Sequence, residues 1–363
     1  MTKILYLIDK PNLYGSELHL LQLIEEFKSN YVIKVIAFSD GPLIDKIKAL
    51  NIPVDILPFS WTPSIKSFKK LREIVFDFTP NIIHGHQPKA TFWAGIISRT
   101  TGVKCINTIH SSAGDTALGK KWYLIKIITV CFHYGIQFFS ELCANKVIFV
   151  SETSKRNAFF KKKAVVIYNW IDKEKQSNYT ERNSNSKVRL LFVGSVSKLK
   201  GVDILIDMLV LLKSKGVNFE IDILGNGESN FVAEVKNKLN EQKIKGVFYG
   251  YVRDTRSYYE KADLFMLFSR TETFGIAYAE AANYGLPIFA RKLPVLKEIL
   301  PDSNYLSDDL NYLSDSLITL MGNKDLYNTI SKVNYNWAKE KFDFNKNIEI
   351  LKLLYISILE KNN

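Results

Sequence analysis

The chain has 363 residues, of which 47% are hydrophobic and 24% are charged. These proportions are typical of globular proteins, and the length exceeds what one hydrophobic core usually serves, so we expect two domains. The three cysteines, Cys105, Cys131 and Cys143, have neither paired nor metal-like spacing. This argues against a structural zinc site and indicates a reducing, cytoplasmic location, with the inner face of the cell membrane as one option.

The net charge of +12 is concentrated in the first half of the chain. Residues 1–187 contain 26 Lys/Arg and 15 Asp/Glu, whereas the remainder contains 23 and 22. A positive half suits peripheral contact with an anionic membrane, and a basic surface without a specific partner is the alternative. Nucleic acid is not expected, because no helix-turn-helix, zinc finger or base-stacking motif accompanies the charge. The basic clusters are Lys66, Lys69, Lys70 and Arg72; Lys120 and Lys121; and Lys161, Lys162 and Lys163.

The N-terminal run MTKILYLIDKPN predicts a buried strand rather than a signal peptide, because its apolar part is short and Asp9 interrupts it. Similar apolar runs then alternate with helical patterns such as residues 16–28 and 66–78. This alternation predicts an α/β domain with a parallel sheet over residues 1–171. The predicted strands are residues 3–9, 32–38, 54–57, 81–84, 104–108, 146–150 and 164–168.

Residues 122–143 raise the question of a membrane span, because they are rich in Ile, Phe and Tyr. Lys126 and Glu141 interrupt this segment, and the uncharged stretch from residue 127 to 140 is too short to cross a bilayer. The segment therefore predicts a buried or partly interfacial helix.

Residues 172–187 contain almost no apolar side chains, which predicts a polar linker. A second strand–helix alternation begins at Val188 and predicts a second domain over residues 188–342. We therefore expect an α/β fold with two Rossmann-like domains and a ligand cleft between them. A final helix, residues 345–360, lies in a C-terminal segment (343–363) that we expect to pack back on the first domain.

Residues 269–280, SRTETFGIAYAE, follow an apolar run and predict a strand, a tight turn and a helix. The backbone amides of Phe274 and Gly275 are expected at the helix start, where anions bind. Glu280 would lie about two turns into the helix and Glu272 just before it, so that both face one ligand. Acidic residues are common at helix starts, so the spacing alone leaves a structural role open.

Together with the following residues AANYGLPI, this segment resembles the Glu, seven residues, Glu signature of family 4 glycosyltransferases. Further motifs fit the same family in order along nearly the whole chain. The resemblance implies the GT-B architecture and sugar transfer from a nucleoside diphosphate sugar with retention at the anomeric carbon. The resemblance also implies uracil as the base of the donor nucleotide, because uracil is the usual base in this family. Glu280 would bind the ribose hydroxyls, and Glu272 would lie near the donor sugar.

In the first domain, Tyr14-Gly15-Ser16-Glu17 resembles the family's glycine turn beside the donor diphosphate. Tyr14 replaces the first of two glycines, so Gly15 alone represents that turn. The resemblance places Ser16 on the acceptor side.

Histidines end two predicted strands, at the edge where open α/β sheets bind ligands. His84-Gly85-His86 resembles a metal pair, but the chain has only five histidines and no third ligand cluster. A hydrogen-bonded residue that closes a strand explains His84 equally well. After the next strand, in Thr108-Ile109-His110-Ser111-Ser112, the resemblance places His110 beside the donor sugar, and it places His86 on the acceptor side.

The second domain opens with a strand, a glycine turn and the sequence Lys200-Gly201, which is a natural diphosphate site. The resemblance assigns Lys200 to the charge that develops on the leaving phosphate. Ser195 occupies the position where the family usually has Arg, so one cation is missing, and Lys198 is a candidate replacement.

Three more segments match the family. Gly225-Asn226-Gly227 resembles the turn beside the nucleotide base, and Val252 lies in the turn whose backbone contacts uracil. The segment YNWID, residues 168–172, matches an Asn-Gly-x-Asp motif, with Trp170 in the Gly position.

The resemblance implies a hexosyltransferase-type enzyme (EC 2.4) of cell-surface polysaccharide biosynthesis, with a saccharide or lipid-linked acceptor. No cofactor is expected, because the sequence lacks the Asp-x-Asp motif that would hold a divalent metal on the diphosphate. Two alternatives stay open. One is a catalytically weak sugar-nucleotide-binding subunit, suggested by Ser195 and Tyr14. The other is a sugar-nucleotide epimerase with the same fold.

Overall fold

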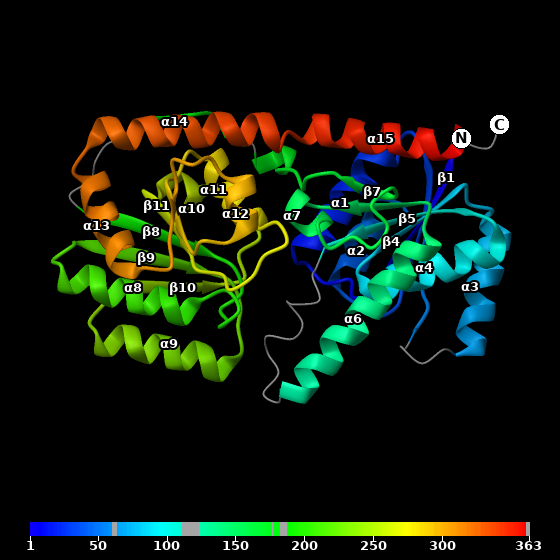
Figure 1. The fold of residues 1–363 in the computed structure, drawn as a ribbon, viewed down its shortest axis with the longest axis horizontal. Helices are drawn as coiled ribbons and strands as arrows, with labels where there is room; N and C mark the ends of the chain where they lie inside the picture. The colour runs from blue at the N-terminus through cyan, green and yellow to red at the C-terminus, as the bar shows by residue number, and fades with distance from the viewer. Residues whose placement is uncertain (60–63, 111–122, 176, 182–186, 361–363) are drawn as a thin grey trace. The chain divides into compact units, whose positions relative to one another are not determined.

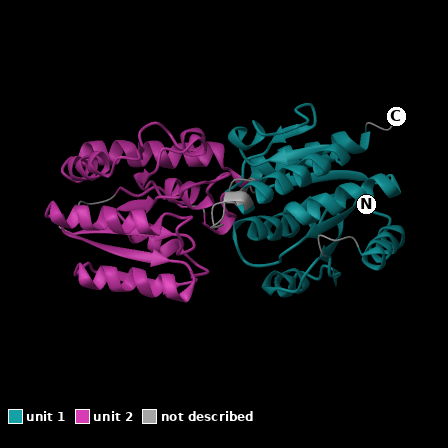
Figure 2. Cartoon of the chain, turned by 60° about the horizontal axis from the view of Figure 1, so that its bottom comes forward, with its two compact units in different colours: residues 1–170, 345–363 teal, residues 171–344 magenta. Residues whose placement is uncertain are grey.

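The computed structural model describes residues 1–59, 64–110, 123–175, 177–181 and 187–360. The chain divides into two compact units (Figure 2). Unit 1 consists of Met1–Trp170 and Asn345–Asn363, and unit 2 consists of Ile171–Phe344. Each unit contains one parallel sheet flanked by helices (Figure 1), which confirms the predicted α/β fold.

Unit 1 has a seven-stranded sheet with the order β3-β2-β1-β4-β5-β6-β7. Residues 4–8 of the inner strand β1 are fully buried, as expected for a parallel strand that has helices on both faces. The order reverses between β1 and β4, and such a reversal is where open α/β sheets bind ligands. The strands are β1 (Lys3–Ile8), β2 (Val32–Ala37), β3 (Val54–Ile56), β4 (Ile82–His86), β5 (Lys104–Ile109), β6 (Lys146–Phe149) and β7 (Ala164–Val166).

The helices of unit 1 include the last helix of the chain, α15. Tyr355 of α15 is fully buried, and its hydroxyl hydrogen-bonds with the hydroxyl of Tyr6 on β1 at 3.2 Å. The final helix therefore packs on the first sheet, as expected for the C-terminal segment. The helices are α1 (Gly15–Phe27), α2 (Pro42–Ala49), α3 (Ile65–Phe78), α4 (Pro88–Thr101), α6 (Tyr123–Cys143), α7 (Glu152–Lys155) and α15 (Phe344–Glu360).

Unit 2 has a six-stranded parallel sheet with the order β10-β9-β8-β11-β12-β13, which reverses between β8 and β11. The strands are β8 (Val188–Val193), β9 (Phe219–Leu224), β10 (Gly246–Gly250), β11 (Leu264–Leu267), β12 (Ile288–Ala290) and β13 (Tyr305–Leu306). The helices are η1, a 3₁₀ turn (Lys173–Lys175), α8 (Val202–Ser214), α9 (Ser229–Glu241), α10 (Arg256–Lys261), α11 (Ile276–Asn283), α12 (Pro294–Ile299), α13 (Leu310–Met321) and α14 (Lys324–Lys341).

The described start of the predicted linker, residues 172–187, packs against unit 2. Asn283 of α11 donates its side-chain N–H to the carbonyl of Lys175 at 3.0 Å, and the hydroxyl of Ser177 donates to the carbonyl of Asn283. The ring of Tyr179 lies 5.5 Å from that of Tyr335 on α14. Low apolar content predicts a connection without structure, but these polar side chains find partners on two helices.

Helix α6 covers nearly all of the segment that raised the question of a membrane span, and Trp122 lies outside the described residues. In the described part of the chain, no helix has the length and apolar character needed to cross a bilayer. Ile136 and Ser140 are buried on one side of α6.

Candidate active site

Unit 2 brings several predicted donor residues to the carboxyl end of its sheet, where the strand order reverses. In the turn after β8, the Val196 N–H donates to the carbonyl of Asn226 at 2.9 Å. The side-chain oxygen of Asn226 accepts from the Tyr251 N–H, also at 2.9 Å. One cluster of turns therefore contains Ser195, Gly225, Asn226, Gly227 and Val252.

A pocket of about 340 Å³ lies beside these turns. Val232 and Ala233 of α9 and Phe248 of β10 line it together with the backbone of the glycine turn. Lys236 adds a cation, with its Nζ 5.3 Å from the centroid of the Phe248 ring. Apolar walls beside exposed backbone groups suit a planar heterocycle.

Lys200 and Glu272, which the sequence assigns to different parts of the ligand, form an ion pair. The Lys200 Nζ lies 2.6 Å from Glu272 Oε1, which also accepts from the Ser269 hydroxyl at 2.8 Å. The Glu272 side chain is only 9% exposed, so water screens the pair weakly. Gly201 has a φ of +66°, and a Cβ there would lie 1.9 Å from the carbonyl oxygen of Phe268. Only glycine lets the turn that carries Lys200 approach the end of β11 so closely.

Helix α11 begins at Ile276, with Gly275 as its N-cap residue. The prediction that Glu280 lies two turns into the helix is wrong, because Glu280 is the fifth residue and lies about one turn in. The left-handed φ of Gly275, +90°, delays the helix start, and a Cβ there would lie 2.6 Å from the Tyr278 ring. The backbone amides of Gly275 and the buried Phe274 therefore precede the first helical turn.

Both carboxylate oxygens of Glu280 have partners within unit 2. The Nζ of Lys175 lies 2.6 Å from Oε1, and the Tyr259 hydroxyl donates to Oε2 at 3.0 Å. Burial alone would lower the pKa of Lys175, but the attraction of Glu280 outweighs it and raises that pKa. The carboxylate is held in one orientation and keeps further lone pairs that can accept hydrogen bonds.

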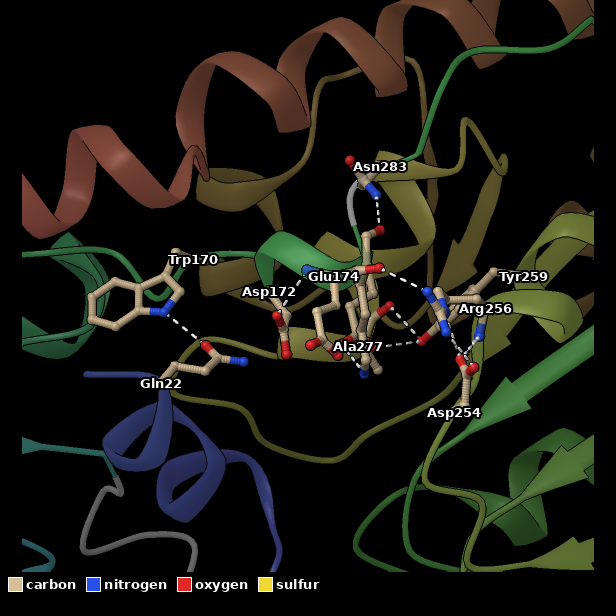
Figure 3. A network of polar contacts seen from close by, with 11 residues as sticks. Gln22, Trp170, Asp172, Glu174, Asp254, Arg256, Tyr259, Ala277 and Asn283 are labelled. Atoms are coloured by element: carbon tan, nitrogen blue, oxygen red, sulfur yellow. Dashed lines mark hydrogen bonds and ion pairs between the residues drawn. The ribbon is translucent and has the colours of Figure 1, made fainter. Parts of the chain in front are cut away.

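A second charged pair, Asp254 and Arg256, contacts Glu174, the residue before Lys175 (Figure 3). Arg256 binds the carboxylate of Asp254 with two N–H groups, at 2.9 and 2.7 Å, and donates to the carbonyl of Glu174 at 3.3 Å. The hydrogen bonds from Arg256 lower the pKa of Asp254 to about 2. Arg256 thus connects the turn after Val252 to the 3₁₀ turn that carries Lys175.

Ser195, in the position where the family usually has Arg, is exposed to solvent. The cation nearest in sequence to the Glu272 turn is Arg270, which binds both carboxylate oxygens of Asp203 at 2.8 and 2.7 Å and donates to the carbonyl of Lys198. Arg270 therefore fixes the turn that carries Lys200. Sequence reasoning missed it, although it stands two residues before Glu272.

Unit 1 gathers its predicted residues at its own strand reversal. Gly15 starts α1, and the Ser16 hydroxyl donates to Glu17 Oε2 at 2.7 Å. Glu17 Oε1 accepts from the side chain of Gln87 at 2.8 Å. Burial raises the pKa of the Glu17 carboxyl. Because Gln87 follows His86, these bonds bring Gly15, Ser16 and His86 to one edge of the sheet.

His84 has the structural role that the sequence left open. Its Nδ1 lies 2.6 Å from the Tyr355 hydroxyl and its Nε2 lies 2.7 Å from the Thr108 hydroxyl. The side chain is fully buried, so both ring nitrogens are used within the core.

His86 and His110 touch directly, with Nδ1 of His86 3.1 Å from Nε2 of His110. His19 on α1 lies edge-on to His110 and stacks on Trp170, with ring centroids 5.4 and 3.8 Å apart. Trp170 donates to the side chain of Gln22 at 2.8 Å (Figure 3). Sequence reasoning missed His19 as a site residue. It could have been found from its spacing, because a residue four positions after Gly15 lies on the same face of the helix.

These histidines are neutral near pH 7. Burial lowers the pKa of His84 to about 3 and that of His110 to about 4. Burial, with smaller contributions from the neighbouring imidazoles, also holds the pKa values of His19 and His86 well below the ordinary value. The His86 Nε2 is buried without a hydrogen-bond partner among the described residues.

No group of three or more His, Cys, Asp or Glu side chains within the described ranges is arranged to hold a metal ion. The cysteines Cys105, Cys131 and Cys143 are free thiols. Ser111, Ser112, Lys120 and Lys121 lie outside the described residues.

Two family models match the chain. The model described as Glycosyltransferase Family 4 matches residues 14–175, and the model described as Glycosyl transferases group 1 matches residues 172–337. An uncharacterized glycosyltransferase of Methanocaldococcus jannaschii is 30% identical over 240 residues, which is 63% of this chain. The chain spans 61% of the length of that relative.

The O-antigen biosynthesis glycosyltransferase WclY of Escherichia coli is 23% identical over 81% of each chain. The crystal structure of Anabaena HepE in complex with UDP and glucose matches with a TM-score of 0.82 at 18% identity. That match covers 98% of this chain and 100% of the HepE chain. The chain belongs to the family 4 glycosyltransferases and has their GT-B fold.

Proposed function

We propose that the chain is a retaining glycosyltransferase of cell-surface polysaccharide biosynthesis. It moves a hexosyl group from a nucleoside diphosphate sugar, with a UDP-sugar as the expected donor, to a saccharide or lipid-linked saccharide. The observation that carries this proposal is the Lys200–Glu272 pair beside the glycine turns of unit 2. HepE, with the same fold, was solved with UDP and glucose, and WclY is named for O-antigen biosynthesis.

The donor diphosphate would lie against Lys200 and the backbone amides of Phe274 and Gly275. When the bond between the sugar C1 and the diphosphate breaks, negative charge develops on the phosphate oxygen. A fixed cation in a weakly screened site stabilises that charge without reorganisation. The ion pair with Glu272 and the glycine at 201 both fix the position of this cation.

Glu272 would contact the donor sugar, and Glu280 would accept hydrogen bonds from the ribose hydroxyls. Glu280 suits this role because Lys175 and Tyr259 fix its orientation and leave lone pairs for a ligand. The pocket of about 340 Å³ beside Gly225, Asn226 and Gly227 would hold the base, with the Val252 backbone close by.

His110 would lie beside the donor sugar, and His86 and Ser16 would face the acceptor. Neutral imidazoles suit hydroxyl groups, since each ring has one donor and one acceptor nitrogen. The buried, unpaired Nε2 of His86 is a group that an acceptor hydroxyl would satisfy.

We infer that transfer needs no divalent metal, because Lys200 and the amides supply positive charge and the sequence lacks Asp-x-Asp. Assays with EDTA and with added Mg²⁺ or Mn²⁺ test this inference. Equal rates are expected, and strict dependence on a metal contradicts it.

A thermal-shift screen against UDP-, GDP- and ADP-sugars tests the donor, because a ligand that binds the folded state raises its apparent stability. Product analysis with the stabilising donor and oligosaccharide or lipid-linked acceptors then tests transfer. Ser195 is exposed and stands in the position where the family usually has Arg. This supports one alternative function, that of a subunit that binds the donor but forms no product. Sugar isomers formed from the donor alone would instead identify an epimerase.

A further inference from the structure

Large apolar side chains are exposed along one face of α6. At 100° per residue, Ile127, Tyr134, Phe138 and Leu142 lie on the side of the helix opposite the buried Ile136 and Ser140. Ile128 and Phe139 lie on the flank between the two sides, where Ile125 (45%) and Phe132 (47%) are exposed as well. A contiguous exposed apolar surface of this kind often marks an interaction site, whereas single exposed apolar residues do not. The α6 apolar face consists of Ile127 (43% exposed), Ile128 (59%), Tyr134 (38%), Phe138 (37%), Phe139 (51%) and Leu142 (37%).

Residues 157–163 form a loop that is fixed against the C-terminal half of α6. Glu141 Oε2 accepts from the N–H groups of Phe159 and Phe160, at 2.9 and 3.0 Å. The Phe159 ring lies 5.4 Å from the Phe138 ring and is itself 44% exposed. Phe159 therefore extends the α6 apolar face.

The same loop adds positive charge to this surface. Lys161 and Lys162 follow the two phenylalanines, and both are exposed. Residues 123–163 contain seven Lys/Arg and two Asp/Glu, and one of the two acids, Glu141, is buried by its contacts with the loop. At the C-terminal end of α6, a pocket of about 370 Å³ is lined by Arg99, Lys104 and Lys163.

We propose that the α6 apolar face, with Lys161 and Lys162, docks on the surface of an anionic lipid bilayer. An amphipathic helix lies in the bilayer interface with its aromatic and aliphatic side chains at the acyl boundary. Lysines beside it meet the anionic headgroups while their stems stay in apolar surroundings. Charge argues against a second copy as the occupant, because self-association would bring Lys161 and Lys162 of two chains together.

Co-sedimentation of the full chain with vesicles tests this surface. One vesicle type is phosphatidylcholine alone, and the other contains 30% phosphatidylglycerol. We expect binding to the anionic vesicles that weakens at 0.5 M NaCl, and little binding to the neutral ones. The variant Ile127→Gln/Ile128→Gln/Phe139→Gln and the variant Lys161→Glu/Lys162→Glu should each reduce vesicle partitioning at least ten-fold.

Two matched controls should bind like the parent. Ile350→Gln/Leu353→Gln/Ile356→Gln removes side chains of α15 with comparable exposure, 41%, 56% and 45%. Lys66→Glu/Lys69→Glu reverses two exposed charges on α3. Circular dichroism establishes that each variant is folded, and the charge variant tests the surface independently if the apolar variant fails to fold.

Equal binding to both vesicle types, absence of binding, or loss of binding in the controls would overturn the proposal. A concentration-dependent dimer that the α6 variant dissociates would instead identify a second copy as the occupant and overturn it too. The test uses neither donor nor acceptor, so its failure leaves sugar transfer untouched. A Lys200→Ala enzyme that has lost transfer should still bind vesicles.

Discussion

The candidate sites of the two units share a sheet topology but differ in charge. Unit 1 presents imidazoles that burial keeps neutral, whereas unit 2 presents the pairs Lys200–Glu272 and Lys175–Glu280. Paired charges suit a ligand that carries phosphates, and neutral rings suit hydroxyl groups. The comparison teaches that one strand arrangement supports two kinds of chemistry, which the residues at the strand ends decide.

The largest effect is expected for a substitution in the charged site of unit 2. Lys200→Ala should lower kcat about 10²–10³-fold, because it removes a fixed cation from the leaving phosphate. Steady-state rates at saturating donor measure the loss. Lys332→Ala, at an exposed position on α14, is the control and should change the rate little. A Lys200→Ala enzyme with the parental rate would remove this residue from the mechanism.

Glu280→Gln keeps the shape of the side chain but removes its charge. We expect donor affinity to fall about ten- to a hundred-fold, in keeping with about 1.5–3 kcal/mol for hydrogen bonds to a charged group. Titration calorimetry with the donor measures the affinity, and Glu241→Gln at the end of α9 is the matched control. Unchanged affinity would show that the ribose does not contact this carboxylate.

On the neutral side, Tyr355→Phe removes a buried hydroxyl that hydrogen-bonds with His84 and Tyr6. The free energy of unfolding should fall by about 1–3 kcal/mol, because buried polar groups lose a partner. Urea unfolding measures this, with the exposed Tyr312→Phe as the control. If both variants unfold at the same urea concentration, the hydroxyl contributes no net stability.

The histidines also predict a pH dependence. Their folded-state pKa values lie below the unfolded value of about 6.5, so only the unfolded chain takes up protons as the pH falls below that value. The contribution of each neutral histidine to the free energy of unfolding is present above about pH 6.5 and is lost toward pH 4. The loss is up to about 1.4 kcal/mol per pH unit for each histidine. Unfolding free energies at pH 5.5 and 7.5 measure the slope, and His110→Gln should reduce it. Equal slopes in parent and variant would contradict the neutral state of His110.

The smallest effect is expected for Ser195→Arg. The position is exposed, so an added cation near the diphosphate should raise kcat/KM by no more than about five-fold, as for charges that water screens. Steady-state rates at low donor concentration measure it. A fall in rate would show that a bulky side chain blocks this turn.

The sequence predicts the fold well, because each parallel strand is a short apolar run between turn residues. The seven strands predicted for the first domain are all observed, and their ends differ from the predicted bounds by no more than two residues. The start of α11 is mispredicted, since a glycine can lie within a turn or at a helix cap and only tertiary contacts decide which. Gly275 takes a left-handed φ, and Glu280 therefore lies one turn earlier in the helix than expected.

Several partners in the candidate site could not be predicted, because they are distant in sequence. Lys175 and Glu280 are 105 residues apart, and His84 and Tyr355 are 271 apart. No periodicity or motif connects such pairs. The assignments of His110, Lys200 and Glu272 to steps of transfer stay predictions.

The return of α15 to the first sheet has a consequence for synthesis on the ribosome. Tyr355, which completes the hydrogen bonds of His84, is translated after all of unit 2. A nascent chain usually folds from its N-terminal domain onward. Here unit 2, which is continuous, can fold as soon as it emerges, whereas unit 1 waits for its last helix. The half made first is therefore finished last, and until then the Nδ1 atom of His84 lacks the hydrogen bond with Tyr355, while Nε2 can already bond with Thr108.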